Sequence, residues 1–457
     1  MRGRLPLYVV ALGLGLASGL LAAWLCHPAT RAGLLAQGLW RAELISYDYR
    51  LSYAPTEERS EEIVLVTIDD ESLSQEGLQV WPWPRDYHAR VLQELKQAGA
   101  RLIGLDVILA GVSGGKGSAI SETGPLALPV PSKADRTLTE AIQSAGNVVL
   151  AMEVASSPVA GKEGAAELEV GSFPHEDFED AALGLGSVNL PRDLDGVIRR
   201  AGVAVTFQEQ SYPSMPIALA ARYLRREPGA FSTEMLSEGR AEHPALGGRS
   251  VLLPYRAPVG AGFVRLPYYR VLQGDFDQAQ VRGKVVLIGS TARSLQDLHY
   301  TPMAMRGVGG RGGAAALMSG VEILASATDA LLHNRRLIPL AQTWTALLTV
   351  LVSALMALAL VRLRPAKALF LAWLPLVTVS VVVSFELFWT RELWVPLVPL
   401  LLGVTLSYGA GTIYLELTAQ RAQRQLRQAW SRRVSPEVLA VILDSPGLTR
   451  VGGRRLV

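Results

Sequence analysis

Four stretches of the chain are continuously hydrophobic and long enough to cross a lipid bilayer. They cover residues 5–25, 340–361, 368–389 and 393–415. A membrane-spanning helix needs about 20 apolar residues, and only the third stretch contains a charged residue, Glu386, near its end. The alternative is a buried helix of a soluble protein, but such helices usually carry a polar face, which these stretches lack. The pattern therefore predicts four transmembrane helices.

Basic residues flank these stretches and predict their orientation. Arg2 and Arg4 precede the first stretch, and three basic residues lie in the loop at 362–367. Five further arginines follow the fourth stretch, between positions 421 and 433. Because Lys and Arg in short flanks are retained on the cytoplasmic side of a membrane, these segments are expected to be cytoplasmic.

We therefore predict a multi-pass protein of the cell (inner) membrane, in contact with the lipid bilayer and with both termini in the cytoplasm. Residues 1–4 and 416–457 would be cytoplasmic, and residues 26–339 extracytoplasmic. A cleaved signal peptide is the alternative for the first stretch, but its apolar run is longer than the usual 7–15 residues. We expect residues 5–25 to remain as an anchor.

The large region at 26–339 alternates between two hydrophobic patterns. Short runs rich in β-branched residues predict strands at 63–68, 102–109, 148–152, 251–253 and 285–288. Segments of helical character lie at 85–97, 135–144, 214–225 and 320–332. Strands that alternate with helices favour an α/β domain around a largely parallel sheet. The expected architecture is thus an α/β extracytoplasmic domain, four transmembrane helices and a cytoplasmic helical linker.

Composition agrees with a membrane protein and excludes several classes. Hydrophobic residues make up 49% and charged residues 19% of the chain, whereas soluble domains carry about 25% charged residues. The net charge of +3 gives no reason to expect a nucleic-acid partner. A single cysteine, Cys26, excludes an intrachain disulfide framework and a cysteine-rich metal site.

Candidate ligand-binding residues follow the predicted strands. Asp69 and Asp70 lie at the carboxyl end of the first strand, and Asp106 lies within the second. Open α/β sheets place ligand sites at this edge, so the three carboxylates, with Arg85 nearby in sequence, would suit a cation or an amine-bearing ligand. The alternative is that the acids cap helices or pair with Arg85 and Arg101. No histidine pair has metal-binding spacing, so the sequence predicts neither a metal site nor a catalytic residue.

Eight motifs in order resemble a known family. They are IVLVTIDDESL (63–73), WPWPRDYHARVL (81–92), AGARLIGLDVIL (98–109), AGNVVLA (145–151), GLGSVNLPRDLDGVIRR (184–200), YPSMPIALA (212–220), VRGKVVLIGSTARSLQDLHYTPM (281–303) and GVEILASATDALL (320–332). Together they resemble the second type of CHASE domain, an extracytoplasmic sensor module of bacterial signalling proteins. The resemblance covers about residues 43–336, and three transmembrane helices after the domain also fit the family. It implies a receptor for an extracytoplasmic ligand, whose identity the sequence leaves open.

The string VSPEVLAVILDSPGLTRVGGRRLV at 434–457 resembles the segment that precedes the catalytic domain of class III nucleotide cyclases. In that family a strand with a metal-binding Asp follows, and here the sequence ends at Val457. The resemblance implies the sensor and membrane portion of an adenylate or guanylate cyclase that works as a homodimer. We expect no catalytic residue and no cofactor in residues 1–457, and Mg²⁺ with ATP or GTP only in a catalytic domain beyond them.

Two other outputs remain open. The first is a receptor that drives a kinase, although all six histidines precede the fourth hydrophobic stretch, which disfavours a histidine kinase within these residues. The second is an orphan receptor that pairs with full-length cyclases.

Overall fold

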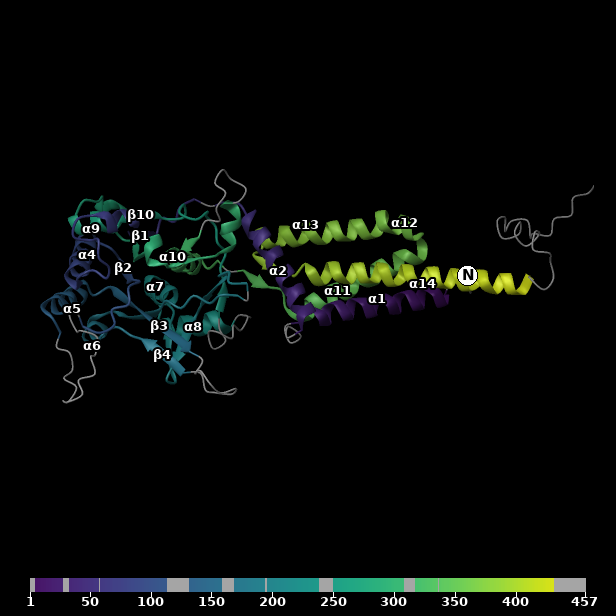
Figure 1. Cartoon of the computed structure of the whole chain (residues 1–457), viewed down its shortest axis with the longest axis horizontal. Coiled ribbons are helices and arrows are strands. Elements are labelled where there is room, and N and C mark those ends of the chain that lie inside the picture. Colours follow the sequence, from purple (N-terminus) through teal and green to yellow (C-terminus); the bar gives the residue numbers. More distant parts are fainter. Residues whose placement is uncertain are drawn as a thin grey trace, which may run out of the picture. The chain divides into compact units, whose positions relative to one another are not determined.

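The computed structural model (Figure 1) describes residues 5–27, 33–56, 58–112, 131–157, 168–193, 195–237, 250–307, 317–335 and 337–430. The chain forms two compact units. We name them after the expectations from the sequence: the membrane unit combines Met1–Glu43, Leu340–Ser384 and Val395–Val457, and the sensor unit combines Leu44–Pro339 with Phe385–Trp394.

A seven-stranded sheet forms the centre of the sensor unit. Its strands follow the order β10-β1-β11-β2-β3-β4, with β5 also paired to β3. All pairings are parallel except that between β3 and β4. The strands are β1 (Ile63–Ile68), β2 (Leu102–Leu105), β3 (Val148–Ser157), β4 (Leu168–Ser172), β5 (Gly184–Ser187), β10 (Val264–Pro267) and β11 (Val285–Ser290). The predicted α/β domain is therefore present, with a mixed sheet.

Helices cover both faces of this sheet (Figure 1). They are α4 (Arg85–Gln97), α5 (Lys133–Ala145), α7 (Met215–Tyr223), α9 (Tyr268–Gln273) and α10 (Gly320–Leu332). Val64 and Val66 of β1 pack in one core with α4, α5 and α9, whereas Ile63 and Leu65 pack in the other with α7 and α10. Every residue of β1 is buried, as expected for a strand in a parallel sheet covered on both sides.

Local signals set the ends of the covering helices. Ser132 and Asp135 form a reciprocal capping box at the start of α5, and Gly146 ends that helix with a φ of 66°. Because a capping box satisfies two free backbone N–H groups and glycine tolerates a left-handed φ, both ends of α5 are well defined.

The sensor unit also contains shorter elements around the sheet. The helices are α3 (Asp70–Ser74), α6 (Glu176–Ala181), α8 (Pro228–Ser237) and the 3₁₀ turns η3 (Gln278–Gln280), η4 (Arg293–Leu295) and η5 (Pro302–Gly307). The strands are β6 (Arg200–Gly202), β7 (Ala204–Phe207), β8 (Gln210–Pro213), β9 (Ser250–Leu252), β12 (Leu298–His299), β13 (Met318–Ser319), β14 (Ile338–Pro339) and β15 (Leu393–Trp394). The predicted strand at 251–253 corresponds to β9, which pairs with β6 outside the main sheet.

Among the described residues, four helices are apolar and long enough to cross a membrane. The elements of the membrane unit are α1 (Leu5–Leu25), α11 (Gln342–Arg362), α12 (Pro365–Ala368), the π-helical turn η6 (Leu369–Trp373), α13 (Leu374–Thr390) as far as Ser384, and α14 (Val398–Trp430). Glycines allow α1, α11 and α14 to approach closely. A Cβ on Gly19 would lie 2.6 Å from the Cα of Val350, and one on Gly15 would lie 2.8 Å from the Cβ of Ala357. Small residues at helix contacts are typical of membrane bundles.

The last hydrophobic stretch differs from the prediction at both ends. Helix α14 begins at Val398, not at 393, because Leu393–Trp394 form β15 and pair with β14. The carboxylate of Glu43 accepts hydrogen bonds from the backbone N–H groups of Leu397 and Val398, both at 2.8 Å, and so caps the start of α14. The helix continues to Trp430, and the cyclase-like string at 434–457 lies outside the described residues.

Candidate functional site

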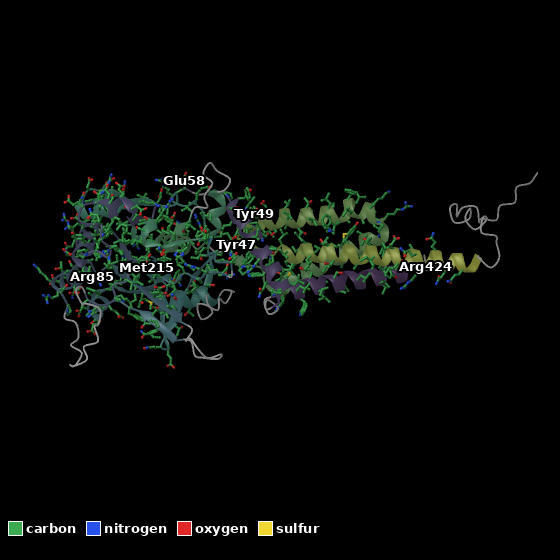
Figure 2. All side chains as sticks on the ribbon, viewed as in Figure 1. Tyr47, Tyr49, Glu58, Arg85, Met215 and Arg424 are labelled. Carbon is green, nitrogen blue, oxygen red and sulfur yellow. The ribbon has the colours of Figure 1, made fainter. Side chains whose placement is uncertain are left out.

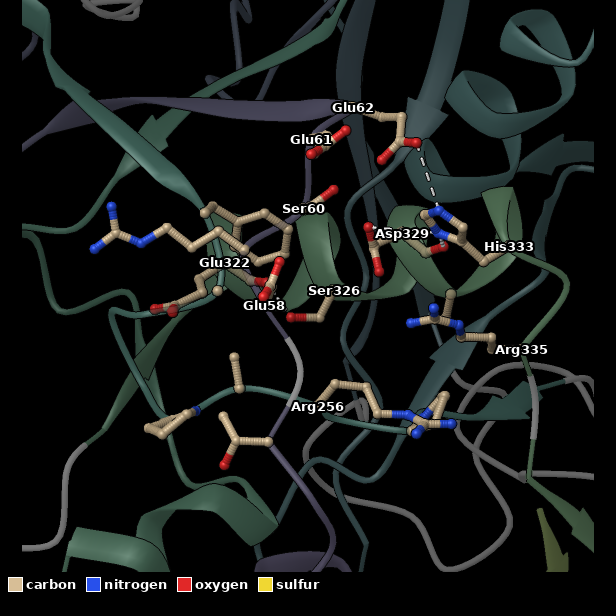
Figure 3. A pocket seen from close by; sticks show the side chains of 18 of the residues that line it. Glu58, Ser60, Glu61, Glu62, Arg256, Glu322, Ser326, Asp329, His333 and Arg335 are labelled. Atoms are coloured by element: carbon tan, nitrogen blue, oxygen red, sulfur yellow. Dashed lines mark hydrogen bonds and ion pairs between the residues drawn. The ribbon is translucent and has the colours of Figure 1, made fainter. Parts of the chain in front are cut away.

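A cavity of about 520 Å³ opens at the amino-terminal edge of the main sheet (Figure 3). Three segments form it: the residues before β1, the loop at 254–263, and one side of α10. Because α10 runs back across the sheet, its C-terminal end reaches the edge where β1 begins. A cavity of this size is typical of small-molecule and cofactor sites.

Charged side chains dominate the cavity wall. Its carboxylates are Glu58, Glu61, Glu62, Glu322 and Asp329, and its arginines are Arg59, Arg256 and Arg335. Glu322 is already neutralised, because it accepts hydrogen bonds from Arg265 Nη2 and from the backbone N–H of Gly260, both at 2.7 Å. Arg256 forms an ion pair with Glu392. These two pairings still leave more carboxylates than arginines on the wall, so the cavity favours a cation.

One group in the cavity combines a histidine with two carboxylates. Glu62, Asp329 and His333 offer ligand atoms that all lie within 4.8 Å of one another. His333 Nε2 lies 3.6 Å from Glu62 Oε1, and His333 Nδ1 lies 3.7 Å from Asp329 Oδ1 (Figure 3). This donor set suits a divalent metal ion.

The end of α10 holds the histidine of this group in place. Asn334 has a φ of 52°, a left-handed conformation that ends the helix directly after His333. The Nδ1 atom of His333 lies 3.0 Å from the backbone oxygen of Asp329. Since a carbonyl oxygen can only accept, this hydrogen bond places an imidazole hydrogen on Nδ1, so Nε2, which lies toward Glu62, is the ring nitrogen available to a ligand.

Two oxygen atoms on the cavity wall lack a hydrogen-bond partner within the described part of the chain. They are Asp329 Oδ1 and Ser60 Oγ, both shielded from solvent. Buried polar atoms of native proteins are nearly always paired, so an unpaired one calls for an explanation such as an ion or a ligand.

The residues chosen from the sequence do not line this cavity. Asp69 caps α3: its carboxylate accepts from the backbone N–H of Ser72 at 2.8 Å and from Thr67 Oγ1 at 3.0 Å. Asp70 is exposed in the first turn of α3. The placement of Asp69 agrees with the capping role considered as the alternative.

Arg85 (Figure 2) serves the packing of α4 against its neighbours. Its guanidinium donates to the backbone oxygens of Ala110 and Gly111, both at 3.4 Å. It also lies 5.3 Å from the centre of the Phe178 ring and 4.0 Å from Asp135. These contacts hold the guanidinium through Nη2 and its stem, whereas the buried Nη1 has no hydrogen-bond partner within the described residues.

Asp106 belongs to a second polar cluster at the carboxyl edge of the sheet. Loss of solvent, together with the charges of Asp297 and Glu153, raises the pKa of Asp106 to about 8. Beside it, His299 accepts from Arg192 at 3.2 Å and donates to Asp297 at 2.9 Å. Asp106 thus does meet other carboxylates, although they are not Asp69 and Asp70.

A third group of contacts lies within the sensor unit and joins its part of α2 to the segment Phe385–Trp394. The ring of Tyr47 on α2 (Leu34–Ser52; Figure 2) packs edge-on against Phe388 and Trp394, at 5.5 and 5.1 Å between ring centres. Trp389 Nε1 donates to the backbone oxygen of Arg50 at 2.8 Å. The connection between α13 and α14 is therefore part of the sensor unit.

An ion network holds α2 to the rest of that unit. The guanidinium of Arg199, whose side chain is 1% exposed, donates two hydrogen bonds of 2.7 Å to Asp48 on α2. It also donates to Asp193 at 2.9 Å and to Asp195 at 2.7 and 2.9 Å. One side chain thus ties α2 to the turn that precedes β6.

Comparison with known protein families shows to which family the chain belongs. The family described as CHASE2 domain matches residues 21–359. The chain belongs to the CHASE2 family. No curated protein and no solved structure matches it. The resemblance seen in the eight motifs is confirmed, and CHASE2 is an extracytoplasmic sensor domain in signal transduction.

Glu62, Asp329 and His333 in the cavity of this CHASE2 domain were not among the site residues predicted from the sequence. Asp329 and His333 are four residues apart near the end of the predicted helix at 320–332, and Glu62 directly precedes the first predicted strand. An Asp-x-x-x-His spacing places both side chains on one helix face, so this signal was present.

Proposed function

We propose that the chain is the sensor and membrane portion of a class III adenylate or guanylate cyclase of the bacterial inner membrane. Membership of the CHASE2 family supports the sensor role. The basic flanks of the hydrophobic helices support a topology with both termini in the cytoplasm. The string at 434–457 supports the cyclase output. The receptor acts as a homodimer, since class III cyclases build their active sites between two subunits.

The observation that carries this proposal is which segments of the chain make up the sensor unit. It contains Phe385–Trp394, which is the end of α13 and the first part of the connection to α14, as well as the part of α2 from Leu44 onward. A ligand that favours one packing of the sensor unit would therefore also bias the ends of these helices. Such a ligand can shift the output only by its difference in affinity for the two states, typically about 1–3 kcal/mol.

A fusion protein tests whether the chain controls a cyclase. The full chain is joined in frame to the catalytic domain of a class III cyclase, and cyclic nucleotide formation is measured in isolated membranes. The variant Trp389→Phe removes the indole N–H that bonds Arg50 and is expected to change the basal rate several-fold. The variant Trp344→Phe alters a 60% exposed tryptophan of α11 and is expected to leave the rate unchanged. Equal rates in all three proteins would contradict the proposed coupling.

A further inference from the structure

We propose that the cavity of the sensor unit binds a divalent transition-metal ion of the Zn²⁺ class through Glu62, Asp329 and His333. The proposal goes beyond the receptor role, because it names a chemical species that the extracytoplasmic domain takes from its surroundings. It does not depend on the type of output domain.

The spacing of the donor atoms fits such an ion. Zn²⁺ binds nitrogen and oxygen ligands at about 2.0–2.2 Å, usually in tetrahedral geometry, which places neighbouring ligand atoms roughly 3.4 Å apart. His333 Nε2 and Glu62 Oε1 lie 3.6 Å apart. One ligand atom from each of the three residues lies within 4.8 Å of the other two, so an ion would need the imidazole and the two carboxylates to turn toward a common centre.

The hydrogen bonds around the group orient the ligands. The bond from His333 Nδ1 to the backbone oxygen of Asp329 is the contact that commonly fixes a metal-binding imidazole and exposes Nε2. The backbone oxygen of Glu62 accepts from the N–H of Val285 at 2.8 Å, so Glu62 is anchored at the edge of the sheet. Ligands on a strand edge and a helix end are held more rigidly than ligands on loops.

Charge and unsatisfied atoms also favour a cation. Two carboxylates and an imidazole that bears its hydrogen on Nδ1 would match the charge of a divalent ion. Asp329 Oδ1 is shielded from solvent and lacks a hydrogen-bond partner in the described structure. An ion would satisfy this oxygen, which His333 Nδ1 approaches only to 3.7 Å.

Three protein ligands would leave at least one coordination position open to the cavity. Structural Zn²⁺ sites are usually closed by four protein ligands, and sites with three keep a position for water or another small ligand. The cavity of about 520 Å³ gives access to that position. The arrangement therefore suits reversible binding by a sensor more than a permanent structural role.

The test measures Zn²⁺ binding to the purified full chain in detergent, after chelator treatment and dialysis. Isothermal titration with ZnCl₂ is expected to show one ion per chain. The variants Glu62→Gln, Asp329→Asn and His333→Ala should each weaken binding by about tenfold or more, since even second-shell changes cost about 10–100-fold at such sites. The two amide variants preserve side-chain size, so they test the site even if His333→Ala folds poorly.

His175→Asn provides the matched control. His175 also lies beside a carboxylate, Asp177, at 3.5 Å, but has no place in the three-residue group. Asparagine keeps an acceptor for the start of α6, so this variant should bind Zn²⁺ like the wild type. Absence of binding by the wild type, or undiminished binding by all three site variants, would overturn the proposal. Neither result bears on the cyclase output, which the fusion protein tests separately.

Discussion

Replacement of Arg199 by Met should destabilise the sensor unit strongly. The guanidinium is 1% exposed and contacts three carboxylates, including the 6% exposed side chain of Asp48. Removal of one partner from a buried ion network leaves uncompensated charges and costs about 3–5 kcal/mol. For a domain of this size, we expect an apparent melting temperature lower by on the order of 10 °C.

Thermal unfolding of the purified chain, followed by tryptophan fluorescence, measures this effect. The matched control is Arg226→Met, which removes an ion pair with Glu234 whose partners are 39% and 43% exposed. Exposed pairs contribute about 0–1 kcal/mol, so the control should unfold close to the wild type. Equal melting temperatures for the two variants would refute the view that the Arg199 network holds α2 in the sensor unit.

Three further predictions concern topology, pH and helix packing. An alkaline phosphatase reporter should be active when fused after Gly260 and inactive when fused after Trp430; activity only after Trp430 would contradict the orientation. The pKa of Asp106 is raised to about 8 in the folded protein. Between about pH 4 and pH 8 the carboxyl is therefore ionised in the unfolded chain but protonated in the folded one, and the stability of the wild type falls as the pH rises. Denaturant unfolding of Asp106→Asn should therefore show a stability gain over the wild type that grows by up to about 1.4 kcal/mol per pH unit in this range; a gain independent of pH would contradict it. Gly19→Ala should lower the melting temperature of the membrane unit, since its Cβ would lie 2.6 Å from Val350, whereas Gly13→Ala meets nothing within 4 Å; equal effects would contradict the helix packing.

Several elements were predictable because one local signal determines them. The strand at 63–68 and the helices at 85–97 and 320–332 have the predicted bounds, since a fully apolar run or an amphipathic segment admits one interpretation. The strand at 102–109 is shorter than expected, because it ends at Leu105 and Asp106 joins the polar cluster at the sheet edge.

Features that depend on tertiary pairing were not predictable in the same way. Helix α2 buries Glu43, Asp48 and Arg50, and these charges conceal its apolar face in the sequence. The residues Leu393–Trp394 are hydrophobic enough to extend a membrane helix, but pairing with β14 makes them a strand.

The candidate site illustrates the same limit. The sequence placed its ligand residues at the carboxyl edge of the sheet, where Asp106 does meet Asp297 and Glu153. The cavity lies at the opposite edge, because α10 carries Asp329 and His333 back to the start of β1. That convergence depends on the direction in which a helix crosses the sheet, which periodicity alone does not specify.

The cyclase output is tested most directly in the organism that carries the gene. Cyclic AMP and cyclic GMP are measured in cells before and after deletion of the gene, and after its restoration in wild-type form or with Trp389→Phe. The account predicts that one of the two nucleotides falls on deletion, returns with the wild-type gene and differs with the variant. Unchanged levels of both nucleotides in all four strains would contradict a cyclase output and favour a kinase.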